Sequence, residues 1–298
     1  MQLLQCASFG TDISATENVL AVSPNSCHRV VNNRDFKSTR GFAQRAGAKR
    51  DAVGFSHLTT VSHSPSRFRI RSVRRIYPQP DMPVTVAEAY GVTRERHPSG
   101  RPWIGLCMVM SIDGSTVVDG NSQALSGPAD LDVLVGLRQL ADVIIVGAST
   151  IRQEGYGPPS KTGQKVGVVT RSGNLDLESE LFRSGAGFLI LPENTAIADT
   201  SVRCVRAGHG SVDLPAAMKQ LEGTFVQLEG GPMLNAAMFA ADLVDEINVT
   251  ISPLIVGGGG PRLTEGAPEL FMRHGIAHVI YDDGFLFVRY IRRTQQLS

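Results

Sequence analysis

The sequence has little cysteine and no long hydrophobic run. Its four cysteines are far apart and form no C-x-x-C pair, so the pattern excludes a disulfide framework and a zinc ribbon and suits a reducing compartment. No apolar stretch reaches the roughly 18 residues that a membrane-spanning helix needs. The first residues lack the charged start and apolar stretch of a secretory signal. We therefore expect a cytoplasmic protein that does not enter a membrane.

Several signatures of catalytic families are also absent. The chain has no G-x-G-x-x-G, which argues against a Rossmann dehydrogenase, and no P-loop with its Lys-Ser/Thr pair. It has no H-x-E followed by P-C-x-x-C, the signature of zinc-dependent deaminases. We therefore expect neither a metal site nor deamination.

Charge is distributed unevenly along the 298 residues, although the net charge is only +1. Residues 1–75 carry 12 Lys and Arg against 4 Asp and Glu, whereas residues 76–298 carry 17 against 24. The acidic body argues against nucleic acid as the main partner. The basic segment, rich in Arg and Ser, has no sustained period and too little apolar surface to offset the entropy of ordering it.

We interpret residues 1–75 as a basic, disordered N-terminal extension unrelated to activity. An organelle transit peptide, residues upstream of the true start and, more weakly, a nucleic-acid-binding arm remain open alternatives. Residues 76–298 are expected to form one domain, because neither a second boundary nor an internal repeat is visible in them.

The body alternates apolar strands with helices. We expect strands at 103–110, 142–147, 167–171, 187–191, 225–228 and 246–253, helices at 85–90, 126–140, 214–221 and 232–241, and a hairpin of 278–281 with 285–290. Repeated strand–helix units with a terminal hairpin predict an α/β fold. Its mixed, mostly parallel sheet is expected to carry helices on both faces, in three layers.

The stretch 225–235 (FVQLEGGPMLN) is the strongest local pattern. An apolar strand leads to Glu229, then to a Gly230-Gly231 turn, and Pro232 stands where the first helical turn begins. The glycines let the backbone approach a bulky ligand, and the free amides of a helix start favour an anion such as a phosphate. An ordinary strand-to-helix loop accounts for the same pattern.

Polar or glycine-containing segments follow several other strands. They include Asp113 after the first strand, Thr150 after the second, and Thr170 with Arg171 after the third. Carboxyl ends of parallel strands meet at one edge of a sheet, so these side chains would line one cleft. A guanidinium there would suit the 2′-phosphate of an adenosine. Simpler interpretations are also open: a hairpin turn at Asp113, a cap at Thr150 and a solvated surface charge at Arg171.

These segments together resemble a known family. Residues 108–114 (MVMSIDG), 141–150 (ADVIIVGAST) and 228–232 (LEGGP) are similar to the reductase domain of the riboflavin-biosynthesis deaminase-reductases, and 243–246 (LVDE) with 251–258 (ISPLIVGG) also fit. Residues 154–158 (EGYGP) resemble the stand-alone actinobacterial-type pyrimidine reductases. The match covers roughly residues 100–295 and implies a dihydrofolate-reductase-like fold, the cofactor NADPH and a homodimer.

The resemblance also implies roles for individual residues. The family reduces 5-amino-6-(5-phosphoribosylamino)uracil by hydride transfer to C1′ of the opened sugar, and Asp113 and Glu229 are the expected catalytic groups that supply a proton or polarise the substrate. Ser122, Arg138, Lys161 and Glu229 would contact the substrate. The residues expected to hold NADPH are Val109, Gly147, Thr150, Glu154, Thr170, Arg171, Gly230, Gly231, Pro232, Met233, Leu234 and Asn235.

The chain departs from the family pattern on the substrate side. Cys107 stands where many members have Lys, and Lys161 falls where a phosphate-binding Arg is usual. Lys can hold a phosphate but lacks the planar fork of Arg. A dihydrofolate or pteridine reductase on the same fold, and a protein that binds NADPH without turnover, are therefore kept as alternative functions.

Overall fold

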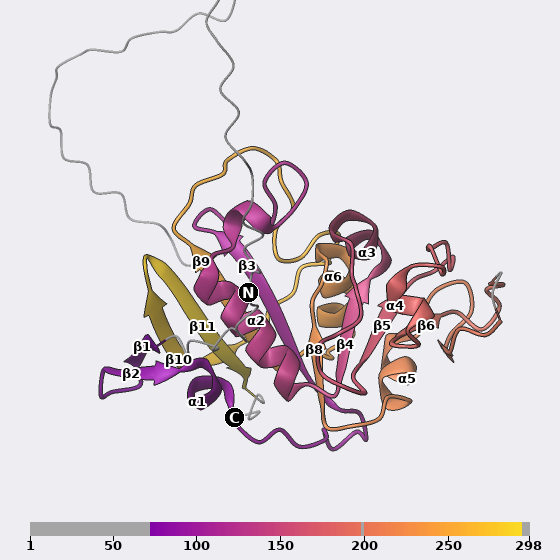
Figure 1. The fold of residues 1–298 in the computed structure, drawn as a ribbon, viewed down its shortest axis with the longest axis horizontal. Coiled ribbons are helices and arrows are strands. Elements are labelled where there is room, and N and C mark those ends of the chain that lie inside the picture. Colours follow the sequence, from indigo (N-terminus) through magenta and orange to yellow (C-terminus); the bar gives the residue numbers. More distant parts are fainter. Residues whose placement is uncertain (1–71, 198–199, 294–298) are drawn as a thin grey trace, which may run out of the picture. The chain divides into compact units, whose positions relative to one another are not determined.

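The computed structural model describes residues 72–197 and 200–293 of the chain. In these residues eleven strands form a single sheet (Figure 1), in the order β2-β1-β10-β11-β9-β3-β8-β4-β5-β6-β7. The strands are β1 (Ser72–Tyr77), β2 (Met82–Thr85), β3 (Trp103–Ser111), β4 (Val143–Gly147), β5 (Lys165–Val169), β6 (Gly187–Leu191), β7 (Cys204–Arg206), β8 (Phe225–Leu228), β9 (Glu246–Ser252), β10 (His274–Asp282) and β11 (Phe285–Arg292).

The sheet has a parallel part and an antiparallel part. Strands from β9 through β3 to β7 run parallel to their neighbours. Strands β2, β1, β10 and β11 add to the β9 edge in antiparallel pairs. Asp282 pairs with Phe285 across the β10–β11 turn, so the hairpin turns at Asp283-Gly284 as predicted. The predicted mixed, mostly parallel sheet with a C-terminal hairpin is confirmed.

Helices cover both faces of this sheet. The hydrophobic cluster on one face includes α5 and α6 with Ile145 of β4, and the cluster on the other face includes α4 with Ile144 of the same strand. Alternate residues of one strand therefore serve opposite layers. The helices are α1 (Val86–Tyr90), α2 (Pro128–Leu140), α3 (Ala148–Glu154), α4 (Glu180–Arg183), α5 (Leu214–Lys219) and α6 (Pro232–Ala240), with a 3₁₀ turn, η1 (Gln123–Leu125).

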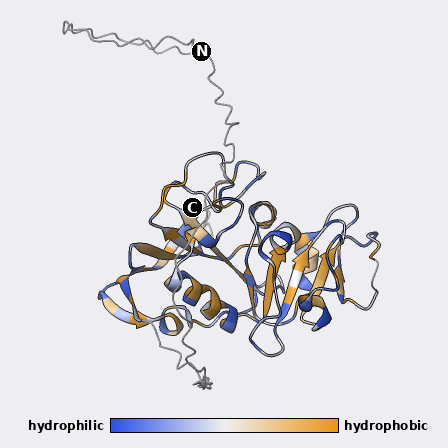
Figure 2. Cartoon of the chain, turned by 45° about the horizontal axis from the view of Figure 1, so that its top comes forward, coloured by the Kyte–Doolittle hydropathy of each residue, from blue (hydrophilic) through white to orange (hydrophobic). Residues whose placement is uncertain are grey.

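The inner parallel strands are buried on both faces, as their continuous apolar sequences predict. Every residue of β4, β6 and β8 is buried, and Figure 2 shows apolar colour along the strands of this part of the sheet. The predicted strands and helices of the body all occur, with ends that differ by a few residues.

Three strands and two helices were not predicted from the sequence: β1, β2, β7, α3 and α4. β1 begins at Ser72, four residues before the expected start of the body, and pairs with β10. In β1 only Val73 is buried, so its composition matches the basic extension to which the sequence assigned it. Residues 1–71, the rest of that predicted extension, lie outside the described residues.

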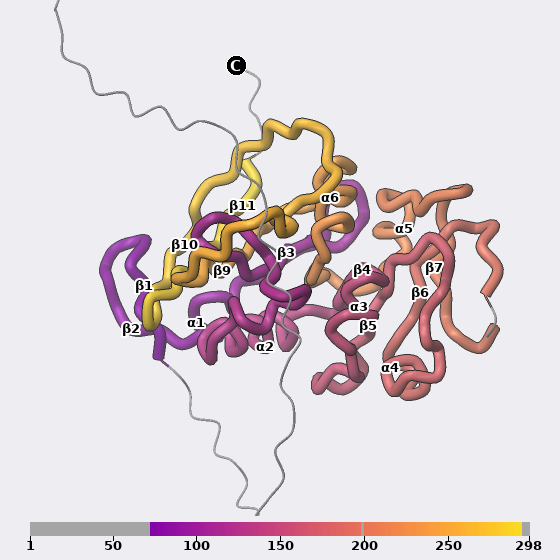
Figure 3. The backbone as a smooth tube through the Cα atoms, turned by 90° about the horizontal axis from the view of Figure 1, so that it is seen from above, coloured from indigo at the N-terminus to yellow at the C-terminus, as the bar shows by residue number. Residues whose placement is uncertain are grey.

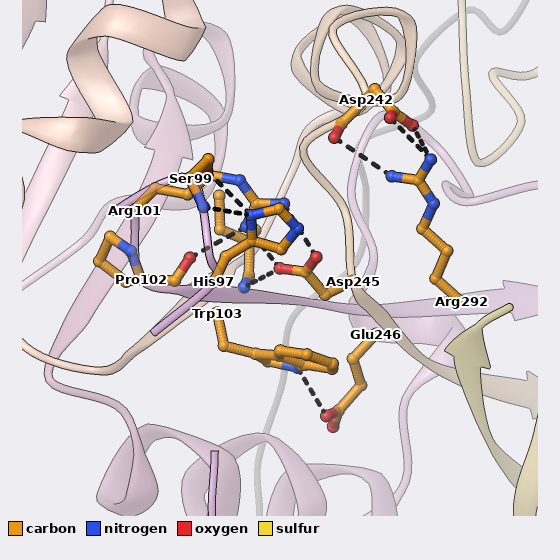
Figure 4. A network of polar contacts seen from close by, with 10 residues as sticks. His97, Ser99, Arg101, Pro102, Trp103, Asp242, Asp245, Glu246 and Arg292 are labelled. Carbon is orange, nitrogen blue, oxygen red and sulfur yellow. Dashed lines mark hydrogen bonds and ion pairs between the residues drawn. The ribbon is translucent and has the colours of Figure 1, made fainter. Parts of the chain in front are cut away.

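Two neighbouring carboxylates hold the middle of the sheet together (Figure 4). Asp245 accepts two hydrogen bonds from Arg101, at 2.6 and 2.8 Å, and one from the backbone amide of Ile104 at 2.9 Å. Glu246, which is fully buried, pairs with Arg94 at 2.7 Å and with Arg289 at 3.0 Å. These contacts join the start of β9 to the start of β3 and to β11.

The register set at these strand starts determines where the strands end. β3 pairs with β9 from Gly105–Glu246 to Ser111–Ser252, so both strands finish at the same level. The segment 253–273 then crosses the beginning of α6, where the amide of Glu265 donates to the carbonyl of Pro232 (Figure 3). The carboxyl edge of the parallel strands is thus bordered by α6 and this long segment.

The Glu246 network yields a stability prediction. Glu246→Ala leaves the buried guanidinium groups of Arg94 and Arg289 without a counter-charge, and should lower the free energy of unfolding by about 3–5 kcal/mol. Urea denaturation of the full chain measures this change. Asp81→Ala is the matched control: it removes the partner of Arg74 in an exposed pair and should cost less than about 1 kcal/mol. Equal losses in the two variants would contradict the prediction.

The same network predicts acid sensitivity. Burial alone would raise the pKa of Glu246, but hydrogen bonds and charge from Arg289 and Arg94 outweigh it and lower that pKa to about 2. The pKa of Glu in an unfolded chain is about 4.3. The stabilisation by Glu246 is therefore complete above that value and is lost as the pH falls toward 2. Denaturation curves measured over this pH range should show that the free energy of unfolding falls less with acid in Glu246→Gln than in the wild type.

Candidate active site

A cavity of about 360 Å³ opens at the carboxyl ends of β3, β4 and β8. Its walls come from β3, the loop after it, α2, α3 and the turn that begins α6. The lining residues are Cys107, Met108, Val109, Thr116, Val117, Ser122, Ser126, Asp130, Leu134, Arg138, Thr150, Gln153, Glu154, Gly155, Tyr156, Gly157, Pro158, Glu229, Gly231 and Pro232.

The Gly230-Gly231 turn forms one wall because its backbone is packed closely against β4 and α3. The amide of Gly147, at the end of β4, donates to the carbonyl of Gly230 at 2.6 Å. A Cβ at position 231 would lie 2.8 Å from Oγ1 of Thr150, and one at position 230 would lie 2.9 Å from Sδ of Met108. Gly230 also has a positive φ of 78°. Both positions therefore require glycine.

Helix α6 begins directly after this turn, with Gly231 as its N-cap and Pro232 in its first turn. No side chain caps the helix start, so its first backbone amides face away from the helix without an intrahelical partner. Met233 is 61% exposed, whereas Leu234 belongs to the hydrophobic core. Nδ2 of Asn235 donates to the carbonyl of Leu263 at 2.9 Å. Leu234 and Asn235 therefore position the turn and do not line the cavity with their side chains.

The cavity wall also holds a paired carboxylate. Nε and Nη2 of Arg138 donate to the two oxygens of Glu229, both at 2.7 Å. The hydroxyl of Tyr156 donates to Oε2 of Glu229 at 2.8 Å, and Nε2 of Gln227 donates to Oε1 at 3.0 Å. The carboxylate of Glu229 is thus fully hydrogen-bonded and faces a planar guanidinium in bidentate geometry.

The electrostatics of this pair follow from its burial. Burial alone would lower the pKa of the Arg138 guanidinium, but the hydrogen bonds and charge of Glu229 outweigh it and raise that pKa. Burial and the charge of Glu229 also raise the pKa of the Tyr156 hydroxyl. Burial, followed by the charge of Asp130, raises the pKa of the Cys107 thiol, which therefore stays neutral. Arg138 keeps its positive charge at the cavity wall.

The family described as RibD C-terminal domain matches residues 102–276. The chain belongs to this family. It is 30% identical over 192 residues to 2,5-diamino-6-ribosylamino-4(3H)-pyrimidinone 5′-phosphate reductase of Methanothermobacter thermautotrophicus, over 57% of this chain and 88% of the relative. The resemblance stated from the motifs, and with it the assignment to an oxidoreductase family, is confirmed.

Solved structures share the fold of this RibD C-terminal domain. A pyrimidine reductase-like protein of Corynebacterium diphtheriae superposes with a TM-score of 0.59 and 22% identity, covering 70% of this chain and 99% of that one. The riboflavin biosynthesis reductase Rib7 of Saccharomyces cerevisiae superposes with a TM-score of 0.55 and 16% identity, covering 69% and 94%. At these identities the likeness supports the fold alone.

Eight of the expected site residues line the cavity of the RibD domain: Val109, Ser122, Arg138, Thr150, Glu154, Glu229, Gly231 and Pro232. Ser122 lies beside Glu154, to which its hydroxyl donates at 2.9 Å. Thr170 and Arg171 follow β5 and are not among the lining residues; Thr170 is buried and accepts a hydrogen bond from the amide of Gly173, whereas Arg171 is exposed. The next residue, Ser172, lines a second hollow of about 600 Å³.

Two residues expected to act on the substrate also lie outside the cavity lining. Lys161 is not a lining residue: its ammonium group donates to the carbonyl of Ala141 at 2.8 Å. Asp113 accepts hydrogen bonds from Ser111 at 2.6 Å and from the amides of Val256 and Gly257 at 3.1 and 2.7 Å. It therefore holds segment 253–273 to the end of β3. These bonds lower the pKa of Asp113 to about 2.

The cavity also contains residues that the sequence did not single out as functional. Tyr156 is part of the EGYGP motif but was assigned no role, and Ser126 and Asp130 were interpreted only as the start of a helix. The local pattern identified the helix start correctly but could not show that the third residue of α2 faces a cavity. In the described part of the chain, no group of three His, Cys, Asp or Glu could hold a metal ion, and no helix is long and apolar enough to cross a membrane.

The close contact between Gly231 and Thr150 yields a prediction. Gly231→Ala places a methyl group 2.8 Å from Oγ1 of Thr150 and should destabilise the protein by about 1–3 kcal/mol through overpacking. Gly259→Ala, where a Cβ meets nothing within 4 Å, is the control and should unfold like the wild type. Urea denaturation measures both.

The double variant Gly231→Ala/Thr150→Ala tests the assigned cause. Removing Oγ1 should restore part of the lost stability, so the two substitutions should be non-additive. Additive effects would show that the contact with Thr150 is not what requires glycine at position 231.

Proposed function

We propose that the protein reduces 5-amino-6-(5-phosphoribosylamino)uracil to its ribitylamino product in riboflavin biosynthesis, with NADPH as hydride donor. The observation that carries the proposal is that one cavity joins the Gly230-Gly231 turn to the Arg138–Glu229 pair. Membership of the RibD family and the activity for which the archaeal relative is named support the same reaction class.

The residues at the turn fit a dinucleotide. The open amides at the start of α6 would bind its phosphates, and Gly230 and Gly231 keep the backbone free of side chains where the ligand approaches. Val109, Thr150 and Glu154 line the same cavity. Thr170 and Arg171 lie beyond β5, where an exposed guanidinium would contact the adenosine 2′-phosphate. Bound NADPH would supply a hydride to C1′ of the opened sugar.

Arg138 is the residue best suited to hold the substrate. Nε and Nη2 are fixed by Glu229, while Nη1 has no hydrogen-bond partner among the described residues, and the side chain is 29% exposed. It can therefore donate to a phosphate or a ring carbonyl without losing its support. Glu229 then acts as the positioning residue for Arg138, and Ser122 contributes a hydroxyl at the rim. Lys161 is not needed for this arrangement.

The reaction also consumes a proton, and neither Asp113 nor Glu229 is well placed to supply it. Asp113 is tied to segment 253–273, and its pKa of about 2 leaves it without a proton at neutral pH. Glu229 is occupied by Arg138, Tyr156 and Gln227. The group that supplies the proton must therefore be sought elsewhere in the cavity.

A turnover assay tests the proposed function. The full chain should consume NADPH when given the ribosylamino-uracil phosphate, and should use NADH less well because Arg171 would lack a phosphate partner. The loss of near-ultraviolet absorbance by reduced nicotinamide measures the rate. The 2,5-diamino-pyrimidinone phosphate named for the archaeal relative should be compared directly with the uracil substrate.

Two outcomes would overturn this assignment. Consumption of NADPH with dihydrofolate and not with either pyrimidine would favour a dihydrofolate reductase on the same fold. Binding of NADPH without consumption with any of these compounds would favour a non-catalytic NADPH-binding protein. A protein without the proposed dinucleotide site would not bind NADPH at all.

Glu229→Gln tests the positioning role. Gln cannot hold the Arg138 guanidinium in bidentate geometry, so turnover should fall by about 100-fold through misplacement of the substrate, while the dissociation constant for NADPH stays unchanged. Glu222→Gln, at a 90% exposed side chain, should behave as the wild type. Loss of NADPH binding in Glu229→Gln would instead make Glu229 a support of the Gly230-Gly231 turn.

Assembly as a homodimer belongs to the same proposal. Ile112 and Ile255 are 60% and 69% exposed, and they lie close together because the amide of Ile112 donates to the carbonyl of Leu254 at 2.9 Å. Exposed aliphatic side chains in one place favour a contact with a second copy. The molar mass of the full chain in solution tests this, and a cytoplasmic location remains a prediction from the sequence.

A further inference from the structure

Three carboxyl groups line the cavity, and they differ in burial and in partners. Glu229 is paired with Arg138, and Glu154, which accepts a hydrogen bond from Ser122, is exposed. The third is Asp130, which has no cationic partner among the described residues. It is only 9% exposed. A buried carboxyl group without a counter-charge is unusual unless it carries a proton.

Two hydroxyl groups from different elements lie near this carboxyl. Asp130 is the third residue of α2, and its Oδ2 accepts a hydrogen bond of 2.5 Å from Oγ of Ser126. The hydroxyl of Thr250, on β9, lies near enough to lower its pKa. The carboxyl is thus held by the loop before α2 beside a central strand, and it lies at the wall of the cavity.

The surroundings of Asp130 favour its neutral form. Burial raises its pKa, and the opposing hydrogen bonds from Ser126 and Thr250 do not outweigh this effect. The titratable groups that feel its charge are Cys107 on β3 and Tyr90 on α1, both neutral because burial raises their own pKa values. The N-terminus of α2 would favour a negative charge, but burial dominates.

The nearby charged groups do not reverse this balance. The causes of the pKa shift of Asp130 are burial and two hydrogen bonds, and no charged group is among them. The carboxylates of Glu229 and Glu246 raise the pKa of the Cys107 thiol. Arg138 also acts on Cys107 with the opposite sign, but its charge is already matched by Glu229. Arg94 and Arg289 are matched by Glu246.

We propose that Asp130 is the proton donor of the reductase reaction. This inference rests on the proposed function. As the C1′–O4′ bond of the ribosyl ring breaks, the carboxyl of Asp130 would transfer its proton to O4′, which becomes a hydroxyl. The electron pair on the amino nitrogen forms a C=N⁺ bond to C1′, and the hydride then adds to C1′ and returns that pair to nitrogen. One proton and one hydride are consumed, and Asp130 is reprotonated from water.

Asp130→Asn is the decisive variant because it keeps the shape of the side chain and removes the transferable proton. Turnover should fall by about 100-fold or more, the range of general acid catalysis, while the dissociation constant for NADPH stays unchanged. Asp132→Asn is the matched control, since Asp132 lies on the same helix and is exposed. It should retain wild-type turnover.

The pH dependence separates proton donation from a structural role. A donor must be protonated, so wild-type kcat/KM should be full at low pH and fall as the pH rises through the pKa of Asp130. Ser126→Ala removes a hydrogen bond that lowers this pKa, so the fall should move to higher pH. In Asp130→Asn the fall should be absent from the residual activity. An unchanged pH profile in both variants would overturn the proposal.

An infrared titration provides a readout that does not require turnover. The wild-type protein should show the carbonyl-stretching band of a protonated carboxyl above the pH at which an ordinary Asp, with a pKa of about 3.9, has ionised. Asp130→Asn should lack that band. Its absence from the wild type, or its persistence in Asp130→Asn, would overturn the assignment whatever the substrate.

The two measurements together distinguish failure of this inference from failure of the proposed function. If the wild type reduces the pyrimidine and Asp130→Asn does so equally well, the proposed function stands and Asp130 is not the donor. If the wild type shows the band but consumes no NADPH with either pyrimidine, the proposed function fails and the catalytic role of Asp130 fails with it.

Discussion

The pairing of Asp245 and Glu246 with buried arginines is the interaction on which the rest of the structure depends. Removing these charges from water is costly, and the cost is met only when each carboxylate oxygen has a well-placed donor. That requirement admits one alignment, in which Asp245 reaches both Arg101 and the amide of Ile104. A shift of β9 by one residue would turn Glu246 away from Arg94 and Arg289. The network therefore fixes the register of β9.

The register of β3 and β9 determines the chemistry at the other end of these strands. Because Ser111 pairs with Ser252, Asp113 lies close to the amides of Val256 and Gly257 and holds segment 253–273 in place. That segment contacts the start of α6 through Glu265. A charge network at the amino ends of the strands thus supports the turn that forms one wall of the cavity.

The strands that are buried on both faces could be predicted from the sequence, because a short, continuous apolar run between turn residues is typical of a covered parallel sheet. Local patterns did not predict β1, whose alternation buries a single valine among arginines, or β7, which has three residues. Helix α3 was also missed, because Ser149 and Thr150 were interpreted as the polar end of a strand. These elements depend on partners far away in the chain, and such partners are not visible in local periodicity.

The site shows the same division between local and distant information. Gly230, Gly231 and Pro232 were identified from a turn pattern, and the turn has the expected geometry. Lys161 occupied the expected position in the motif, but a carbonyl of the α2–β4 connection binds its ammonium group. Spacing along a chain places a Cα atom, whereas the direction of a long side chain depends on what it can reach.

The contrast between Glu229 and Asp130 shows why composition alone could not assign the acid. Both are carboxyl groups in one cavity, but Glu229 meets a guanidinium in bidentate geometry while Asp130 meets only hydroxyl groups. A cation stabilises the carboxylate and makes it an anchor. Burial without a counter-charge instead raises the pKa of Asp130. The same functional group therefore positions Arg138 in one case and would donate a proton in the other. The environment assigns the role, because a carboxyl group paired with a guanidinium and one buried without a counter-charge can act in one site without competing for the same proton.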